Sequence, residues 1–167
     1  MVIEGWQPDY ALKEAIKVFS KGDYKLIVTT GGPLDQGSFL TPFKTYARLA
    51  KLSLNEMGIA DSLTVAVPAE SVRKDRTYQS AVALKKWLDH SNLQVKKIDL
   101  ISLGAHTRRS AMVFKSVLKP QVKIGKISVE NTDYEPGKWW KSSEGVKTVC
   151  TELISVVYTF FFLALKS

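Results

Sequence analysis

The chain has 167 residues, of which 45% are apolar, as expected for one soluble domain with a single core. The formal charge of +8 indicates either a lysine-rich solvated surface or an anionic partner, such as a small ligand, a membrane face or a nucleic acid. No groove-reading motif, RNP-type box or dense basic tail accompanies this charge, so we expect no nucleic-acid partner.

The single cysteine, Cys150, excludes a disulfide within the chain and a CxxC metal or redox pair. Because Cys150 lies on the apolar side of a helical pattern, we expect a packed core thiol and not a reactive nucleophile. The chain has no G-x-S-x-G elbow, no HExxH and no carboxylate cluster with metal spacing. We therefore predict no metal site, and the sequence names no cofactor.

Apolar strand patterns alternate with helical patterns along the chain. Val2 and Ile3 form a short apolar start that predicts the end of a strand whose beginning is missing upstream. Further strands are predicted at residues 24–30, 63–67, 100–103 and 122–129, and helices at 8–21, 43–57, 77–88 and 110–118. This alternation predicts one three-layer α/β/α Rossmann-like domain over 1–167, with a mainly parallel sheet of about five strands. Right-handed crossovers then bring the strand ends to one edge.

The segment 137–167 predicts a long helix that packs on the domain or extends from it. Apolar residues recur every three or four positions from Val146 to Leu165, interrupted by Glu152. The unbroken apolar part is shorter than the ~20 residues of a membrane span. We expect a core helix with an exposed aromatic end, and the alternative is a partner or membrane contact. Trp139 and Trp140 either cover a ligand ring or pack beneath the start of this helix.

The strongest candidate site follows the predicted strand at 100–103. Gly104 ends this strand, and His106, Arg108 and Arg109 follow at the start of a helix. Ligands of α/β sheets bind at the carboxyl ends of strands, and helix N-termini favour anions. We expect His106 to act as a general acid or base and both arginines to clamp a phosphate or carboxylate, unless they are only surface charges.

Other strand ends supply the remaining candidates. Gly31 and Gly32 follow the second strand and offer backbone donors, although neither a GxGxxG motif nor a Walker lysine is present and a plain turn is the alternative. The loop after the third strand carries Arg73 and Arg76, and Thr77 is a candidate helix cap and ligand contact.

An orienting carboxylate for His106 is also expected at a strand end. The candidates are Glu4, Glu70 and Asp133, which lie after the first, third and fifth predicted strands. Of these we expect Glu4 or Glu70 to orient the imidazole.

Four segments together resemble a bacterial family. These segments are Val2-Ile3-Glu4-Gly5, Thr30-Gly31-Gly32, Arg76-Thr77-Tyr78-Gln79-Ser80-Ala81 and Gly104-Ala105-His106-Thr107-Arg108-Arg109-Ser110-Ala111. They resemble the SanA/YdcF/ElyC-like family, a domain of unassigned function, over most of residues 1–130. Gly31 and Gly32 match its Gly-Gly, Thr77 and Ala81 match the ends of its T-x-x-N-A helix start, and His106 and Arg109 match its H-x-x-R-A motif.

Two departures from the family pattern indicate a divergent branch. The asparagine of the helix-start motif is replaced by Gln79 or Ser80, and the Trp139–Trp140 segment lies outside the pattern. The resemblance implies a Rossmann-like three-layer fold and association with the bacterial cell envelope. Many members carry an N-terminal membrane anchor, and the family is suspected to be enzymatic, with no settled reaction.

The sequence therefore predicts an envelope-associated enzyme, a hydrolase or transferase, that acts on a phosphorylated or otherwise anionic small molecule. His106 transfers the proton, oriented by Glu4 or Glu70, and the arginines named above with Gly104, Gly31 and Gly32 surround the ligand. The alternative is a non-catalytic module that binds a nucleotide-like ligand or a partner protein. Membrane contact is expected through an upstream anchor or through the aromatic C-terminal helix.

Overall fold

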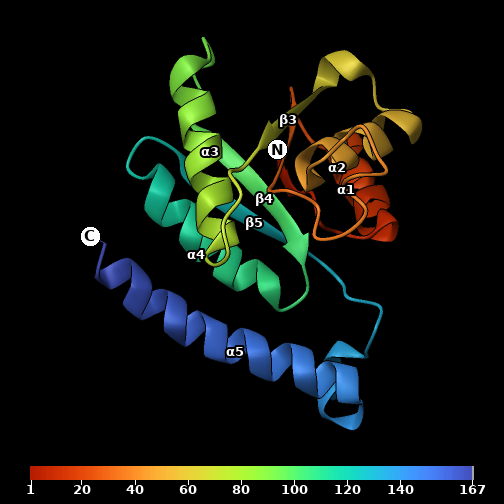
Figure 1. Cartoon of the computed structure of the whole chain (residues 1–167), viewed down its shortest axis with the longest axis vertical. Helices are drawn as coiled ribbons and strands as arrows, with labels where there is room; N and C mark the ends of the chain where they lie inside the picture. The colour runs from red at the N-terminus through yellow and green to blue at the C-terminus, as the bar shows by residue number, and fades with distance from the viewer. Residues whose placement is uncertain (167) are drawn as a thin grey trace.

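A five-stranded parallel sheet forms the centre of the protein in the computed structural model, which describes residues 1–166 (Figure 1). The strands are β1 (Val2–Glu4), β2 (Ile27–Gly31), β3 (Thr64–Pro68), β4 (Lys97–Leu103) and β5 (Lys123–Val129). They lie in the order β3-β2-β1-β4-β5, and every neighbouring pair is parallel. The predicted fold class is confirmed.

Helices cover both faces of this sheet. One face packs against α1 (Asp9–Lys21) and α2 (Tyr46–Glu56), and the other against α3 (Arg76–His90) and α4 (His106–Leu118). Two short 3-10 helices, η1 (Asp61–Leu63) and η2 (Pro136–Lys141), precede β3 and the last helix, α5 (Ser143–Ala164). Figure 1 shows α5 as a long rod outside the sheet, beside α4.

The central strand β1 supplies side chains to both hydrophobic clusters. Val2 packs with Leu100 and Phe114 on the α3/α4 face, while Ile3 packs with Ile101 on the α1/α2 face. All five side chains are at most 1% exposed, and burying each contributes roughly 1.5–3 kcal/mol. Because a parallel sheet is buried on both faces, its strands appear in the sequence as continuous apolar runs.

Helix starts differ from the sequence prediction in a way that matters for the site. Helix α4 begins at His106 and not at residue 110, so the histidine and the arginines form its first turn. Helix α3 begins at Arg76, directly after Asp75, which adopts a left-handed backbone with φ 59°. Residues that were expected in loops are therefore held by helices.

Helix α5 differs from the sequence expectations in the exposure of Cys150, in its position outside the core and in its apolar length. Cys150 is exposed and is not a packed core thiol, and Leu153 and Ile154 are exposed as well, so α5 is not a core helix. Its buried residues are Gly145, which packs against η2, and Thr159, so no large apolar side chain of α5 is buried. With 22 residues and a mean hydropathy of 1.6, α5 is long and apolar enough to cross a membrane by length and composition.

Candidate functional site

A cleft of about 560 Å³ opens at the carboxyl edge of the sheet. Its walls come from the residues that follow β1 and β2, the first turns of α2, α3 and α4, and one residue of α5. The structure brings these sequence candidates together around it: Glu4, Gly31, Gly32, Arg76, Thr77, His106 and Arg109.

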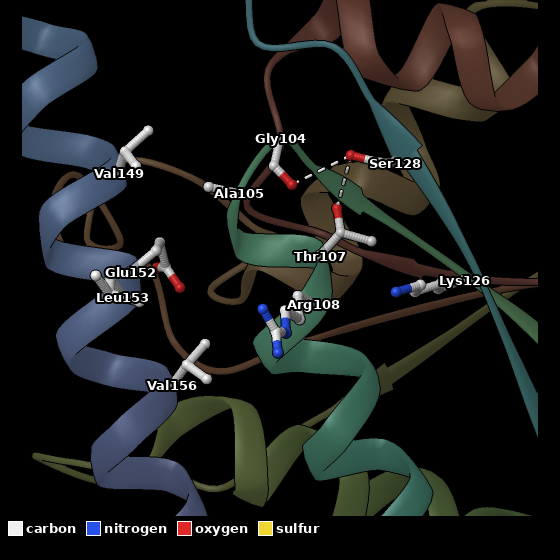
Figure 2. Close-up of a pocket in the computed structure, with 10 residues that line it drawn as sticks. All are labelled: Gly104, Ala105, Thr107, Arg108, Lys126, Ser128, Val149, Glu152, Leu153 and Val156. Carbon is white, nitrogen blue, oxygen red and sulfur yellow. Dashed lines mark hydrogen bonds between the residues drawn. The ribbon is translucent and has the colours of Figure 1, made fainter. Parts of the chain in front are cut away.

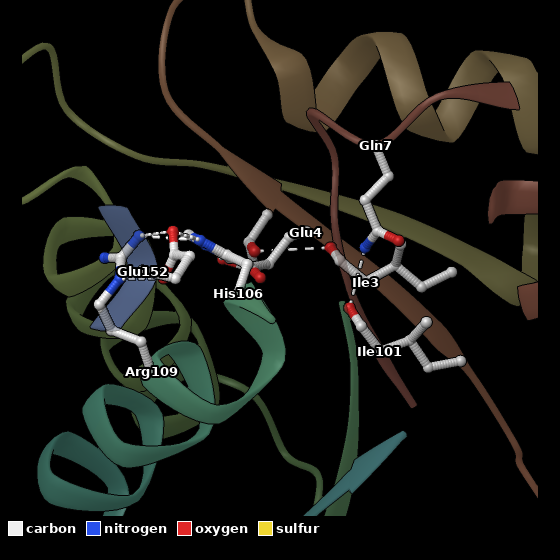
Figure 3. Close-up of polar contacts among 8 residues, drawn as sticks. Ile3, Glu4, Gln7, Ile101, His106, Arg109 and Glu152 are labelled. Atoms are coloured by element: carbon white, nitrogen blue, oxygen red, sulfur yellow. Dashed lines mark hydrogen bonds and ion pairs between the residues drawn. The ribbon is translucent and has the colours of Figure 1, made fainter. Parts of the chain in front are cut away.

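His106 lies between two carboxylates at this cleft. Its Nδ1 is 2.8 Å from Oε1 of Glu152, and its Nε2 is 3.6 Å from Oε1 of Glu4 (Figure 3). Trp6 packs against the ring in an edge-to-face arrangement, with the two ring centroids 5.0 Å apart. The imidazole is therefore oriented from three sides: by Glu4 of β1, by Glu152 of α5 and by Trp6 in the turn after β1.

Arg109 completes the cluster through Glu152. Its Nε donates to Oε2 at 2.8 Å and its Nη2 donates to Oε1 at 3.0 Å, which is a bidentate pair (Figure 3). Nη2 also lies 2.8 Å from Nδ1 of His106, a hydrogen bond only when that nitrogen carries no proton. When the imidazole is doubly protonated, both groups instead donate to Glu152.

The cluster is ionised at neutral pH. Burial alone would lower the pKa of His106, but hydrogen bonds to Glu152 and Glu4 outweigh it and raise that pKa to about 9. Burial would raise the pKa of Glu152, but hydrogen bonds from His106 and Arg109 lower it to about 2. Burial likewise opposes ionisation of Glu4, yet hydrogen bonding and attraction to His106 hold its pKa below the usual range.

Four buried polar atoms gather around Glu4 and are only loosely paired with one another: none forms a hydrogen bond of good geometry within residues 1–166, although His106, Ser102 and Ser110 all lower the pKa of Glu4. They are Oε2 of Glu4, Nε2 of His106 and the hydroxyl oxygens of Ser102 and Ser110. An unsatisfied buried polar atom costs about 1–3 kcal/mol, and native proteins contain few of them. Their concentration at one place fits a site whose hydrogen bonds are completed by a ligand or by water.

Three helix N-termini point toward this cleft. Tyr46, Thr77 and His106 lie in the first turns of α2, α3 and α4 and all line it. Gly31 permits the close approach of α2, since its φ is +151° and an added Cβ would lie 2.8 Å from the Cβ of Tyr46. Helix N-termini carry partial positive charge, so this arrangement favours an anion.

Arg76 stands at the rim of the cleft and already has a partner. Its Nη1 donates to both oxygens of Asp35 at 2.7 and 2.9 Å, and this contact lowers the pKa of that carboxyl. Tyr46 donates a further hydrogen bond of 3.2 Å to Asp35. The pair is exposed, so this ion pair contributes little to the stability of the cleft.

Several sequence candidates do not reach the cleft. Glu70 and Asp133 are exposed, and the Glu70 carboxylate lies 3.5 Å from Nζ of Lys86. The expectation that Glu70 orients His106 is wrong, because the Glu70 carboxylate is turned to Lys86, and Glu4 and Glu152 take that role. Arg73 is exposed on the same loop and does not line the cleft.

Gly104 and Arg108 belong to a second cleft of about 400 Å³ between α4, α5 and β5 (Figure 2). Adjacent helical residues are rotated by roughly 100°, so Arg108 and Arg109 cannot point to the same side of α4. The expectation that both arginines clamp one ligand is therefore wrong. Gly104 adopts φ +48°, which suits the tight turn from β4 into α4.

Several residues of the site were missed in the sequence, and two of them contact His106. Glu152 reaches the cluster from α5, and Trp6 covers the imidazole. The signal for Glu152 was its position as the one acidic residue between Gly145 and Leu165. A carboxylate in so apolar a helix is costly unless it has a charged partner.

Comparison of this chain with family models, curated proteins and solved structures gave no match. Within residues 1–166, no group of three or more His, Cys, Asp and Glu side chains is arranged to hold a metal ion.

Proposed function

We propose that this protein is an enzyme that acts on a phosphorylated or otherwise anionic small molecule bound in the cleft of His106. The observation that carries the proposal is the imidazole held between Glu4 and Glu152. With a pKa raised to about 9, this imidazole is protonated at neutral pH and serves as a proton donor to a leaving group.

Glu4 supplies the complementary acceptor. One of its oxygens faces His106, and the hydroxyl groups of Ser102 and Ser110 also help to keep the pKa of this carboxyl low. A carboxylate held ionised beside an imidazolium can accept a proton from water or from a hydroxyl group while the imidazolium donates one. This pairing of acid and base supports hydrolysis or group transfer.

The ligand is expected to be anionic because three helix N-termini meet at the cleft and Gly31 and Gly32 line it with backbone. The arginines contribute little to the attraction of an anionic ligand, since Arg76 is paired with Asp35 and Arg109 with Glu152. Backbone dipoles and His106 therefore contribute most to the recognition of an anion.

The alternative is a non-catalytic module for a nucleotide-like ligand or a partner protein. Trp6 is 40% exposed at the cleft, and Tyr46 lines it too, so a flat ring has two aromatic side chains available for stacking. In that case His106 would affect affinity alone.

The resemblance described from the sequence adds a location to this proposal, the bacterial cell envelope. The apolar surface of α5 supports contact with a membrane.

A thermal-shift screen followed by turnover assays tests this function. The panel holds nucleotides, sugar phosphates and short polyprenyl phosphates, and a ligand at ~100 times its Kd stabilises the fold by about 2.7 kcal/mol. We expect His106→Gln to lose turnover by roughly 100-fold or more, and to keep the part of the thermal shift that comes from the backbone donors of the cleft. The matched control is His90→Gln, on an exposed helix end.

A thermal shift without turnover from any ligand would assign the non-catalytic alternative. Unchanged turnover in His106→Gln would contradict the role of the imidazole as proton donor.

A further inference from the structure

Helix α5 exposes large apolar side chains to solvent and turns polar side chains toward the domain, which is unusual for a helix packed on a soluble domain. Its side toward the domain carries Glu152, Ser155 and Thr159 at a helical spacing of three and four, with the partly buried Val149, Val156 and Phe162 beside them. The opposite side, here called the outer face, is exposed and apolar. The outer face consists of Val146, Leu153, Ile154, Val157, Phe160, Phe161 and Leu165, whereas Tyr158 turns toward the domain and donates to Asp75.

The outer face is too exposed and too continuous to be ordinary surface. Ile154 is 70% exposed and Phe161 63%, and only 6% of the most apolar stretch of α5 is buried. Contiguous apolar patches of this kind mark interaction sites in soluble proteins.

Two cations without partners border the outer face. Arg108 and Lys126 line the second cleft, whose other wall is formed by Val149, Leu153 and Val156 of α5 (Figure 2). Neither cationic side chain forms a hydrogen bond or ion pair with any other residue in the part of the chain that the structure describes. Leu153 belongs to both surfaces, so the cations and the apolar face are continuous.

We propose that the outer face of α5, with Arg108 and Lys126 beside it, docks the protein on an anionic lipid bilayer. An amphipathic helix of this kind lies in the plane of the interface, with its apolar side buried in the boundary between headgroups and acyl chains. Lipid phosphates would then enter the second cleft, where a guanidinium and an ammonium face an apolar wall. This docking is independent of the reaction proposed for the first cleft.

The contacts of Glu152 argue against α5 spanning the bilayer. Its carboxylate is bidentate with Arg109 and accepts from His106, so insertion would separate three charged groups. Burying such a charge in hydrocarbon is costly. Docking through the outer face leaves the cluster intact, and the protein binds as a peripheral domain.

Vesicle co-sedimentation of the full chain tests this proposal. The probes are vesicles of phosphatidylcholine alone and of phosphatidylcholine mixed with phosphatidylglycerol. We expect binding to the mixed vesicles, at least about tenfold weaker binding to neutral ones, and release of the protein by high salt.

Two variants and their matched controls separate the contributions. Arg108→Ala with Lys126→Ala is expected to weaken binding about tenfold, whereas Lys13→Ala with Lys21→Ala on α1 removes the same charge and has little effect. Ile154→Ser with Phe161→Ser is expected to abolish binding, and Leu52→Ser with Leu93→Ser, also at exposed positions, is its control.

A fluorescent label at Cys150 reports membrane binding without any substitution of the apolar residues of the outer face. As the one cysteine of the chain, exposed on α5, it accepts an environment-sensitive dye, whose emission is expected to shift to the blue on mixed vesicles.

Equal binding to both vesicle types, equal loss in the two charge variants, or no binding and no shift would overturn the proposal. Resistance to high salt would indicate insertion, and dimers abolished by Ile154→Ser with Phe161→Ser would assign the outer face to a second copy.

Discussion

At the scale of single residues, the cluster is held together by balanced charge. Two carboxylates, Glu4 and Glu152, face two cations, His106 and Arg109. Removing one partner of such a buried group leaves the other charge uncompensated and costs roughly 3–5 kcal/mol. The protonation state of His106 is therefore coupled to the folding of the domain.

This coupling predicts that stability falls with rising pH. The pKa of His106 is raised from about 6.5 in the unfolded chain to about 9, so its contribution is complete below pH 6.5 and is lost as pH rises through 9. The loss is on the order of 3 kcal/mol. Urea unfolding of the wild type and of His106→Gln between pH 6 and about pH 9.5 measures it.

The difference between the two unfolding curves isolates His106 from other titrating groups. We expect this difference to shrink steadily across the range. A difference independent of pH would mean that folding does not shift the pKa of His106, and it would contradict the role of a proton donor that is charged at neutral pH.

Residue types at strand ends were sufficient to predict His106, Glu4 and Arg109. Glu152 was not predictable in its role, because it comes from a helix 46 residues after His106 and no local pattern links the two. That Arg108 and Arg109 line different clefts follows from the residue at which α4 begins. A helix start at His106 instead of residue 110 gives the two side chains different directions.

At the scale of elements, close approach of α2 to the end of β2 shapes the cleft. Gly31→Ala is expected to destabilise the fold by about 2 kcal/mol or more, since its φ of +151° disfavours a side chain and the new Cβ would lie 2.8 Å from the Cβ of Tyr46. Chemical denaturation measures the change.

Gly137→Ala is the matched control, because nothing lies within 4 Å of the Cβ that it would add. Equal stability of the two variants would show that α2 can retreat from Gly31 at little cost. The account of how this helix borders the cleft would then be wrong.

Element types were predictable from periodicity, whereas the orientation of α5 was not. Its apolar spacing correctly indicated a helix, but the usual rule that the apolar side faces the core gave the wrong side. The reason is Glu152, whose ion pairs with Arg109 and His106 bind the polar side to the domain. Cys150 was misplaced for the same reason.

At the scale of the whole molecule, the strand order explains why distant residues meet. β1 lies between β2 and β4, so Glu4, Gly31 and Gly104 end three adjacent strands. The alternation of strands and helices predicted a parallel sheet but could not give this order. With β1 at the centre, Glu4 lies beside Ser102 and below the first turn of α4, where His106 begins the helix.

The measurement that tests the central claim most directly is a nuclear magnetic resonance titration of the histidine ring signals with phosphorylated ligands. The chain has two histidines, and exposed His90 serves as the internal control for His106. We expect at least one phosphorylated ligand to shift the His106 ring signals in a saturable manner and to leave those of His90 unchanged. If no member of the panel moves the His106 signals, or both rings respond alike, the cleft is not the binding site for an anionic ligand.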